Sequence, residues 1–149
     1  MASDIKKIAG DLSVRAGEYL DAAKMISMMD TTLPAQAGRP SFPVYSLMAQ
    51  SVELSLKAVL LLHGVSDLKK YGHDLLRLWA TCAVLEHKAG GSFQDVPVLD
   101  LLLLSEAYQK DYLRYAEVTD FELLPSTNGM FVLAETFIEM YESRLGDQG

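Results

Sequence analysis

The segment from Val44 to His63 is the feature that most constrains how this chain folds. Its apolar residues would lie on almost every side of an α-helix, and Glu53 and Lys57 are its only formal charges before His63. A helix that is apolar nearly all round is buried in a protein core. Because burying a charge without a partner costs free energy, both charged residues need partners. The segment is therefore predicted to be the central helix of a globular domain.

Apolar residues recur at intervals of three and four in five segments, and no strand-like alternation of useful length appears. The predicted helices cover residues 4–29, 44–63, 74–88, 95–108 and 126–145, with boundaries good to a few residues. With 149 residues and no internal repeat, the chain is predicted to form one domain over residues 1–149. Helices of this length with short connections make an all-α, up-and-down bundle of about five helices, mostly antiparallel between neighbours.

The first and last predicted helices each have one apolar face that we expect to be buried. On the first, this face consists of Ile5, Ile8, Leu12, Ala16, Tyr19, Ala23 and Ile26. On the last, it consists of Met130, Ala134, Phe137, Ile138, Tyr141 and Leu145, with Glu135, Glu139 and Glu142 facing water. Near the end of the first helix come three methionines, Met25, Met28 and Met29. We expect them to pack in the core, and an adaptable contact surface is the alternative.

Charge and cysteine content exclude several classes of protein. A net charge of −7 argues against bulk binding to DNA or to an anionic membrane, which needs clustered Lys and Arg. Cys82 is the single cysteine and is expected to be a buried free thiol. The histidines lack metal-ligand spacing, so we expect neither a metal site nor a cofactor. Since no segment reads as a signal peptide or a membrane span, we expect a cytoplasmic protein.

Glu53 and Lys57 form a charged stripe on the central helix. Together with Ser46 and Gln50 they fall within roughly 60° of each other around the helix axis. One interpretation is a narrow strip that faces solvent and holds one ion pair, worth about 0.3–0.5 kcal/mol. The other is a partly buried pair that faces a cleft or a subunit interface, where Lys57 supplies a positive charge.

The dipeptide His73-Asp74 stands where the third helix is predicted to begin. Asp74 suits the positive end of a helix dipole, and His73 can cap or pack there. The functional alternative is that His73 helps to hold a phosphate or a partner at this helix end.

Three motifs follow one another along the chain. They are Glu53-Leu54-x-Leu56-Lys57-Ala58 with Leu61-Leu62-x-Gly64, then Gly72-His73-Asp74-Leu75, then Tyr112-Leu113-Arg114-Tyr115. In this order they resemble the HEPN family of small helical bundles, in its non-nuclease form, over residues 19–141. The resemblance implies an up-and-down bundle, usually a homodimer, with a cleft proposed to hold nucleotides or RNA.

Many HEPN proteins are metal-independent ribonucleases that use an arginine followed after four to six residues by a histidine. The chain departs from that pattern, because none of its arginines is followed by a histidine at this spacing. Lys57 and His63 have the spacing but lie roughly 240° apart around one helix. Lysine also lacks the bidentate fork of arginine. We therefore expect neither ribonuclease activity nor catalytic residues.

The sequence thus favours a non-catalytic, HEPN-like binding module for a nucleotide or another phosphate-bearing ligand. Lys57 and Arg114 would supply positive charge, His73 a hydrogen-bond donor, and Tyr112 or Tyr115 a ring that stacks on a base. Two acidic residues, Glu53 and Asp74, would orient the basic groups. The alternative is a protein-interaction and dimerisation component of a prokaryotic toxin–antitoxin or stress-response operon, with an operon-encoded protein partner.

Overall fold

The computed structural model describes residues 2–30, 42–91, 96–109 and 125–148, and these residues form an all-α bundle. The helices are α1 (Ala2–Asp30), α2 (Phe42–Leu62), α3 (Leu75–Lys88), α4 (Val98–Gln109) and α5 (Thr127–Asp147), with a short 3₁₀-helix, η1 (Lys69–Tyr71). No strand occurs in the described part of the chain. The predicted fold class and the five predicted helices are confirmed. The predicted start of the fourth helix, Asp95, lies outside the described residues.

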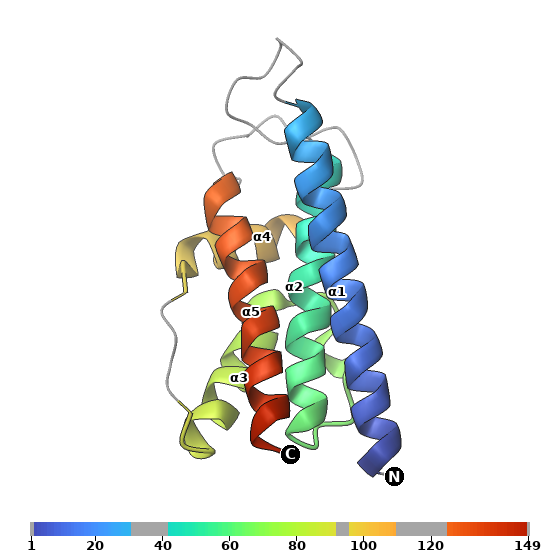
Figure 1. Cartoon of the computed structure of the whole chain (residues 1–149). Coiled ribbons are helices and arrows are strands. Elements are labelled where there is room, and N and C mark those ends of the chain that lie inside the picture. The colour runs from blue at the N-terminus through green and yellow to red at the C-terminus, as the bar shows by residue number, and fades with distance from the viewer. Residues whose placement is uncertain (1, 31–41, 92–95, 110–124, 149) are drawn as a thin grey trace.

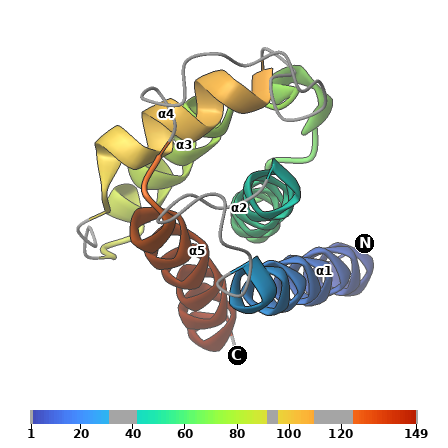
Figure 2. The ribbon, with the colours of Figure 1, turned by 90° about the horizontal axis from the view of Figure 1, so that it is seen from above.

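The three longest helices, α1, α2 and α5, run lengthwise, and both chain termini lie at one end of the molecule (Figure 1). The two shorter helices, α3 and α4, lie across the other side of α2 from α1 (Figure 2). As a result α2 contacts all four of the other helices. Any polar group on α2 is therefore within reach of side chains from several elements.

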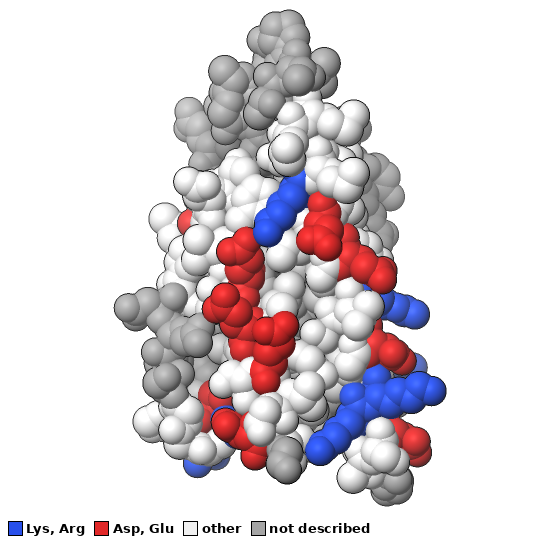
Figure 3. Space-filling view, viewed as in Figure 1, with Lys and Arg blue, Asp and Glu red and all other residues white. Residues whose placement is uncertain are grey.

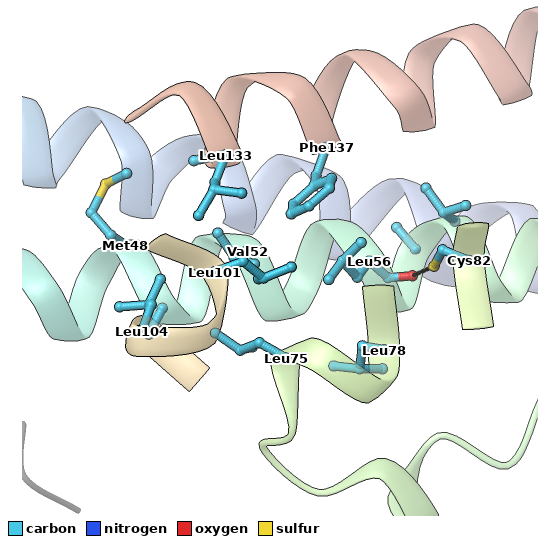
Figure 4. Close-up of a cluster of buried hydrophobic side chains, with 14 of the residues drawn as sticks. Met48, Val52, Leu56, Leu75, Leu78, Cys82, Leu101, Leu104, Leu133 and Phe137 are labelled. Carbon is cyan, nitrogen blue, oxygen red and sulfur yellow. Dashed lines mark hydrogen bonds between the residues drawn. The ribbon is translucent and has the colours of Figure 1, made fainter. Parts of the chain in front are cut away.

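The central position of α2 explains why it is so apolar. Fully buried side chains from the other helices, including Leu75, Leu78 and Phe137, pack around Val52 and Leu56 (Figure 4). By length and composition Pro43–Leu62 could cross a membrane, but 72% of that stretch is buried inside the bundle, as is typical of the core helix of a soluble protein. The five-helix bundle covers α2 by itself, so a dimer is not needed to bury this helix.

Small residues bring α1 close to α2. Ala9, Ala16 and Ala23 recur every seven residues on α1 and are fully buried. The Ser51 hydroxyl on α2 donates a hydrogen bond to the Ala16 carbonyl oxygen at 2.8 Å, which only a close approach of the two backbones allows.

Some residues predicted to be buried are exposed. Ile8 is exposed because the neighbouring Ala9 faces α2 instead. The core-packing expectation for Met25, Met28 and Met29 is wrong, because all three are exposed where the last turns of α1 extend past the start of α5 (Figure 1). Leu145, near the end of α5, is also exposed.

The connection between α2 and α3 turns the chain back along α2. Gly64 ends α2 with φ +85°, a conformation that glycine adopts without a Cβ clash. The Val65 and Gly64 amides donate to the carbonyl oxygens of Leu60 and Leu61, each at 3.0 Å. At the other end of the connection, the Asp74 carboxylate caps α3 by accepting a hydrogen bond from the Arg77 amide at 3.0 Å. The returning chain places His73 beside the middle of α2.

Candidate functional site

A buried carboxylate, that of Glu53, lies at the centre of the candidate site. One oxygen, Oε1, accepts a hydrogen bond from Lys57 Nζ at 2.9 Å and lies 2.8 Å from His73 Nδ1. The other oxygen, Oε2, accepts a hydrogen bond from the Tyr108 hydroxyl at 2.9 Å. We call Glu53, Lys57, His73 and Tyr108 the Glu53 cluster. It joins α2, the start of α3 and the end of α4.

Burial decides between the two interpretations of the charged stripe. Glu53 is 5% exposed, and the side chain of Lys57 is 18% exposed. A strip that faces solvent is therefore the wrong description of Glu53, and the pair is partly buried. Because an ionised carboxylate only accepts hydrogen bonds, its three donors meet its bonding needs as a buried group.

His73 is the exposed member of the Glu53 cluster. Its Nδ1–H donates to Glu53, because a carboxylate can only accept, and its ring meets the Tyr108 ring edge-on with 5.0 Å between the centroids. The side chain is nevertheless 56% exposed. Its second ring nitrogen, Nε2, has no partner in the described part of the chain. The ring is therefore held at one nitrogen and open to a ligand at the other.

The structure brings three of the predicted site residues together: Lys57, His73 and Glu53. Asp74 serves α3 as its N-cap. The predicted residues Arg114 and Tyr112, and the alternative Tyr115, lie outside the described residues. Tyr108 was not predicted. Its signal was indirect, since a buried Glu53 needs more donors than Lys57 alone supplies.

A second carboxylate, that of Glu86, is nearly buried and lies at the C-terminal end of α2, beside His63. Its oxygens accept two hydrogen bonds from the Arg144 guanidinium, at 3.0 and 2.7 Å, and Oε1 lies 2.7 Å from His63 Nε2. We call Glu86, His63 and Arg144 the Glu86 cluster. Burial by itself would raise the pKa of Glu86, but the hydrogen bonds from Arg144 and His63 outweigh it and hold this pKa below its usual value. The same pairing raises the pKa of Arg144.

The Glu86 cluster was not predicted from the sequence. Its members are 23 and 58 positions apart, so no local spacing relates them. The sequence indicated only that His63 closes a helix. This cluster ties α2, α3 and α5 together at a point where all three side chains are nearly buried.

Cys82 is buried, as predicted, and its thiol donates to the Leu56 carbonyl oxygen at 3.4 Å (Figure 4). Burial raises the pKa of this thiol, so it is held in its neutral, unreactive form. In the described part of the chain, no group of three or more His, Cys, Asp or Glu side chains is placed to hold a metal ion.

Comparison with known protein families, curated proteins and solved structures gave no match to this chain.

Proposed function

We propose that this chain is a non-catalytic, HEPN-like binding module that takes a phosphate-bearing ligand, such as a nucleotide, at Lys57 and His73. The observation that carries the proposal is that one buried carboxylate anchors an exposed histidine and a partly buried lysine. Structural ion pairs do not require an exposed imidazole. Here the ring nitrogen that faces away from Glu53 is available to a ligand.

The charges of the Glu53 cluster favour an anionic ligand. Glu53 neutralises Lys57, so the pair alone does not repel an anion, and protonation of His73 makes the cluster net positive. A phosphate oxygen can accept hydrogen bonds from the remaining N–H groups of Lys57 and from His73 Nε2–H. As the HEPN resemblance implies, Arg114 would add a second cation and Tyr112 a stacking ring.

Replacing Lys57 with alanine is expected to weaken binding of a nucleotide such as AMP by about 1–3 kcal/mol, the range for one charge-assisted hydrogen bond. His73→Ala and Arg114→Ala should act in the same direction. Isothermal titration calorimetry measures the affinity. The matched control is Lys24→Ala, which removes a lysine that is paired with Glu135 on the α1 and α5 face. If none of the three changes alters nucleotide affinity while Lys57→Ala lowers the melting temperature, the cluster is structural and the proposal fails.

A second function, protein interaction or dimerisation within an operon-encoded system, is favoured by a different observation. The helix α4 is apolar on nearly all sides, and Val98, Leu99 and Leu102 on it are exposed, Leu99 to 68%. In a small domain such neighbouring apolar side chains are a typical contact surface. The apolar surface that a partner or second copy would cover therefore lies on α4 rather than on α2.

If the chain forms a homodimer through α4, light scattering at micromolar concentration should give about twice the chain mass of 16.4 kDa. Changing both Leu99 and Leu102 to lysine should return the mass to that of a monomer, because charges would be buried at the interface. Val14→Lys, on the exposed side of α1, is the control and should leave the mass unchanged. A wild-type protein that is monomeric at this concentration would count against dimerisation.

A further inference from the structure

The contact between Glu53 and His73 determines which nitrogen of the imidazole is able to react. Glu53 is 5% exposed, and its Oε1 lies 2.8 Å from His73 Nδ1, so Nδ1 carries the proton of this hydrogen bond. In the neutral ring Nε2 then holds a lone pair. Because the His73 side chain is 56% exposed, this lone pair is accessible from solvent. A buried carboxylate thus fixes one tautomer of an accessible imidazole.

The other two histidines of the chain are placed differently. The side chain of His63 is only 10% exposed, and its Nε2 lies 2.7 Å from Glu86 Oε1, so this nitrogen is already engaged. His87 is exposed in the last turn of α3. The chain therefore offers one nearly buried histidine and one exposed histidine with which the reactivity of His73 can be compared.

The groups around His73 suit the approach of a phosphoryl group. The Tyr108 ring meets the imidazole edge-on, with 5.0 Å between the centroids, and so limits rotation of the imidazole. Lys57 Nζ donates to the same Glu53 oxygen that His73 contacts, which places a positive charge beside the imidazole. An ammonium group has three N–H donors, so Lys57 can also donate to a phosphoryl oxygen.

We propose that His73 is a phosphoryl-acceptor residue that an acyl phosphate modifies at Nε2. The Nε2 lone pair attacks phosphorus, and the N–P bond forms as the P–O bond to the acyl group breaks. The leaving carboxylate takes the bonding electron pair and needs no proton, so the step requires no general acid. The Nδ1 proton stays on the ring, and the negative charge of Glu53 balances the positive charge of the phosphorylated imidazole.

This inference rests on the proposed function, because the acyl phosphate would be a phosphate-bearing ligand of the same site. It adds a covalent modification to that binding. His73 accepts one group for each chain and is not regenerated in the step, so the chain remains a non-catalytic module.

The test is incubation of the full chain with acetyl phosphate, followed by intact-mass and peptide-mapping mass spectrometry. We expect one phosphoryl group for each chain, on His73, which acid removes and base does not, as is typical of phosphohistidine. Phosphorus NMR should place the group on Nε2. Within the same sample, His73 should be labelled at least about tenfold faster than His87, since only His73 is held in the reactive tautomer by Glu53. His63 should stay unlabelled.

Variants test the roles of Glu53 and Lys57. His73→Gln should abolish the label. Glu53→Gln should slow labelling at least about tenfold, because an amide can donate to Nδ1 and so place the ring proton on Nε2. Lys57→Ala should slow it about tenfold, the effect of losing one charge-assisted hydrogen bond. Melting curves show whether each variant is folded, and the comparison of His73 with His87 in the natural protein does not depend on any variant.

The matched control comes from the other side of α2. Lys24 lies on α1, which is across α2 from α3, and pairs with Glu135 of α5 (Figure 2). Acidic side chains gather over α5 (Figure 3), where Glu135, Glu139 and Glu142 are exposed as predicted. Lys24→Ala therefore removes an exposed lysine away from His73 and should leave the rate of labelling unchanged.

Three results would overturn the inference. If AMP binds through Lys57 and His73 but acetyl phosphate leaves His73 unmodified, the proposed function stands and the phosphoryl-acceptor inference fails. The same conclusion follows if His87 is labelled as fast as His73, because exposure alone would then explain the reaction. If AMP does not bind and His73 is not labelled, the proposed function and the inference fail together.

Discussion

Replacing Glu53 with alanine is expected to lower the free energy of unfolding by about 4 kcal/mol. Breaking a buried ion pair by removing one member typically costs 3–5 kcal/mol, because the remaining charge is left without a partner. Here the loss leaves Lys57 without its carboxylate and frees Tyr108 and His73, which link α4 and the start of α3 to α2. Chemical denaturation followed by circular dichroism measures the change.

Two further variants test whether the loss of stability comes from the buried contacts of Glu53. Tyr108→Phe removes one hydrogen bond to Glu53 and keeps the ring, so we expect a loss of about 1–2 kcal/mol. Glu139→Ala removes an exposed carboxylate from α5 and should change stability by less than about 0.5 kcal/mol. A Glu53→Ala variant that is as stable as Glu139→Ala would show that the buried cluster contributes nothing to the fold.

Replacing Glu86 with alanine is expected to cost about 3 kcal/mol, because it leaves the nearly buried guanidinium of Arg144 without its carboxylate. The reverse change, Arg144→Ala, leaves Glu86 with only His63 and should cost a similar amount. Glu142→Ala, on the exposed side of α5, is the control. If Glu86→Ala and Arg144→Ala have the same denaturation midpoint as Glu142→Ala, the Glu86 cluster does not stabilise the fold.

The Glu86 cluster also predicts a dependence of stability on pH. The pKa of Glu86 is lower in the folded protein than in the unfolded chain, where it is about 4.3. Its stabilising contribution is therefore complete above the unfolded pKa and is lost as the pH falls through the folded pKa. The difference in unfolding free energy between the natural protein and Glu86→Gln should accordingly shrink as the pH falls below the unfolded pKa of about 4.3. A difference that stayed constant down to about pH 3 would contradict the linkage.

Both clusters attach other helices to α2. Each of its two polar sites holds other elements against it: the Glu53 cluster holds the start of α3 and the end of α4, and the Glu86 cluster holds α3 and α5. In the first cluster a member is exposed, and in the second all three side chains are nearly buried. This difference in exposure is why we place a ligand at the Glu53 cluster and assign the Glu86 cluster to stability.

The sequence by itself determined the helices and the central role of α2. Their signals are local, since apolar spacing, Gly64 after α2 and Asp74 before α3 act within a few residues of each helix. It also indicated that Glu53 and Lys57 need partners, because the cost of burying a charge follows from composition alone.

Only the tertiary structure decided which residues are the hydrogen-bond partners of Glu53 and Glu86. Tyr108 is 55 positions from Glu53, and Arg144 is 58 positions from Glu86, so packing of the helices rather than spacing brings them together. The exposure of Ile8 and of the methionines at the end of α1 was decided in the same way, by how α1 is rotated and how far it extends past α5. The 3.6-residue period shows which residues share a face of a helix. The neighbouring helices determine which face is buried and how far along the helix the burial extends.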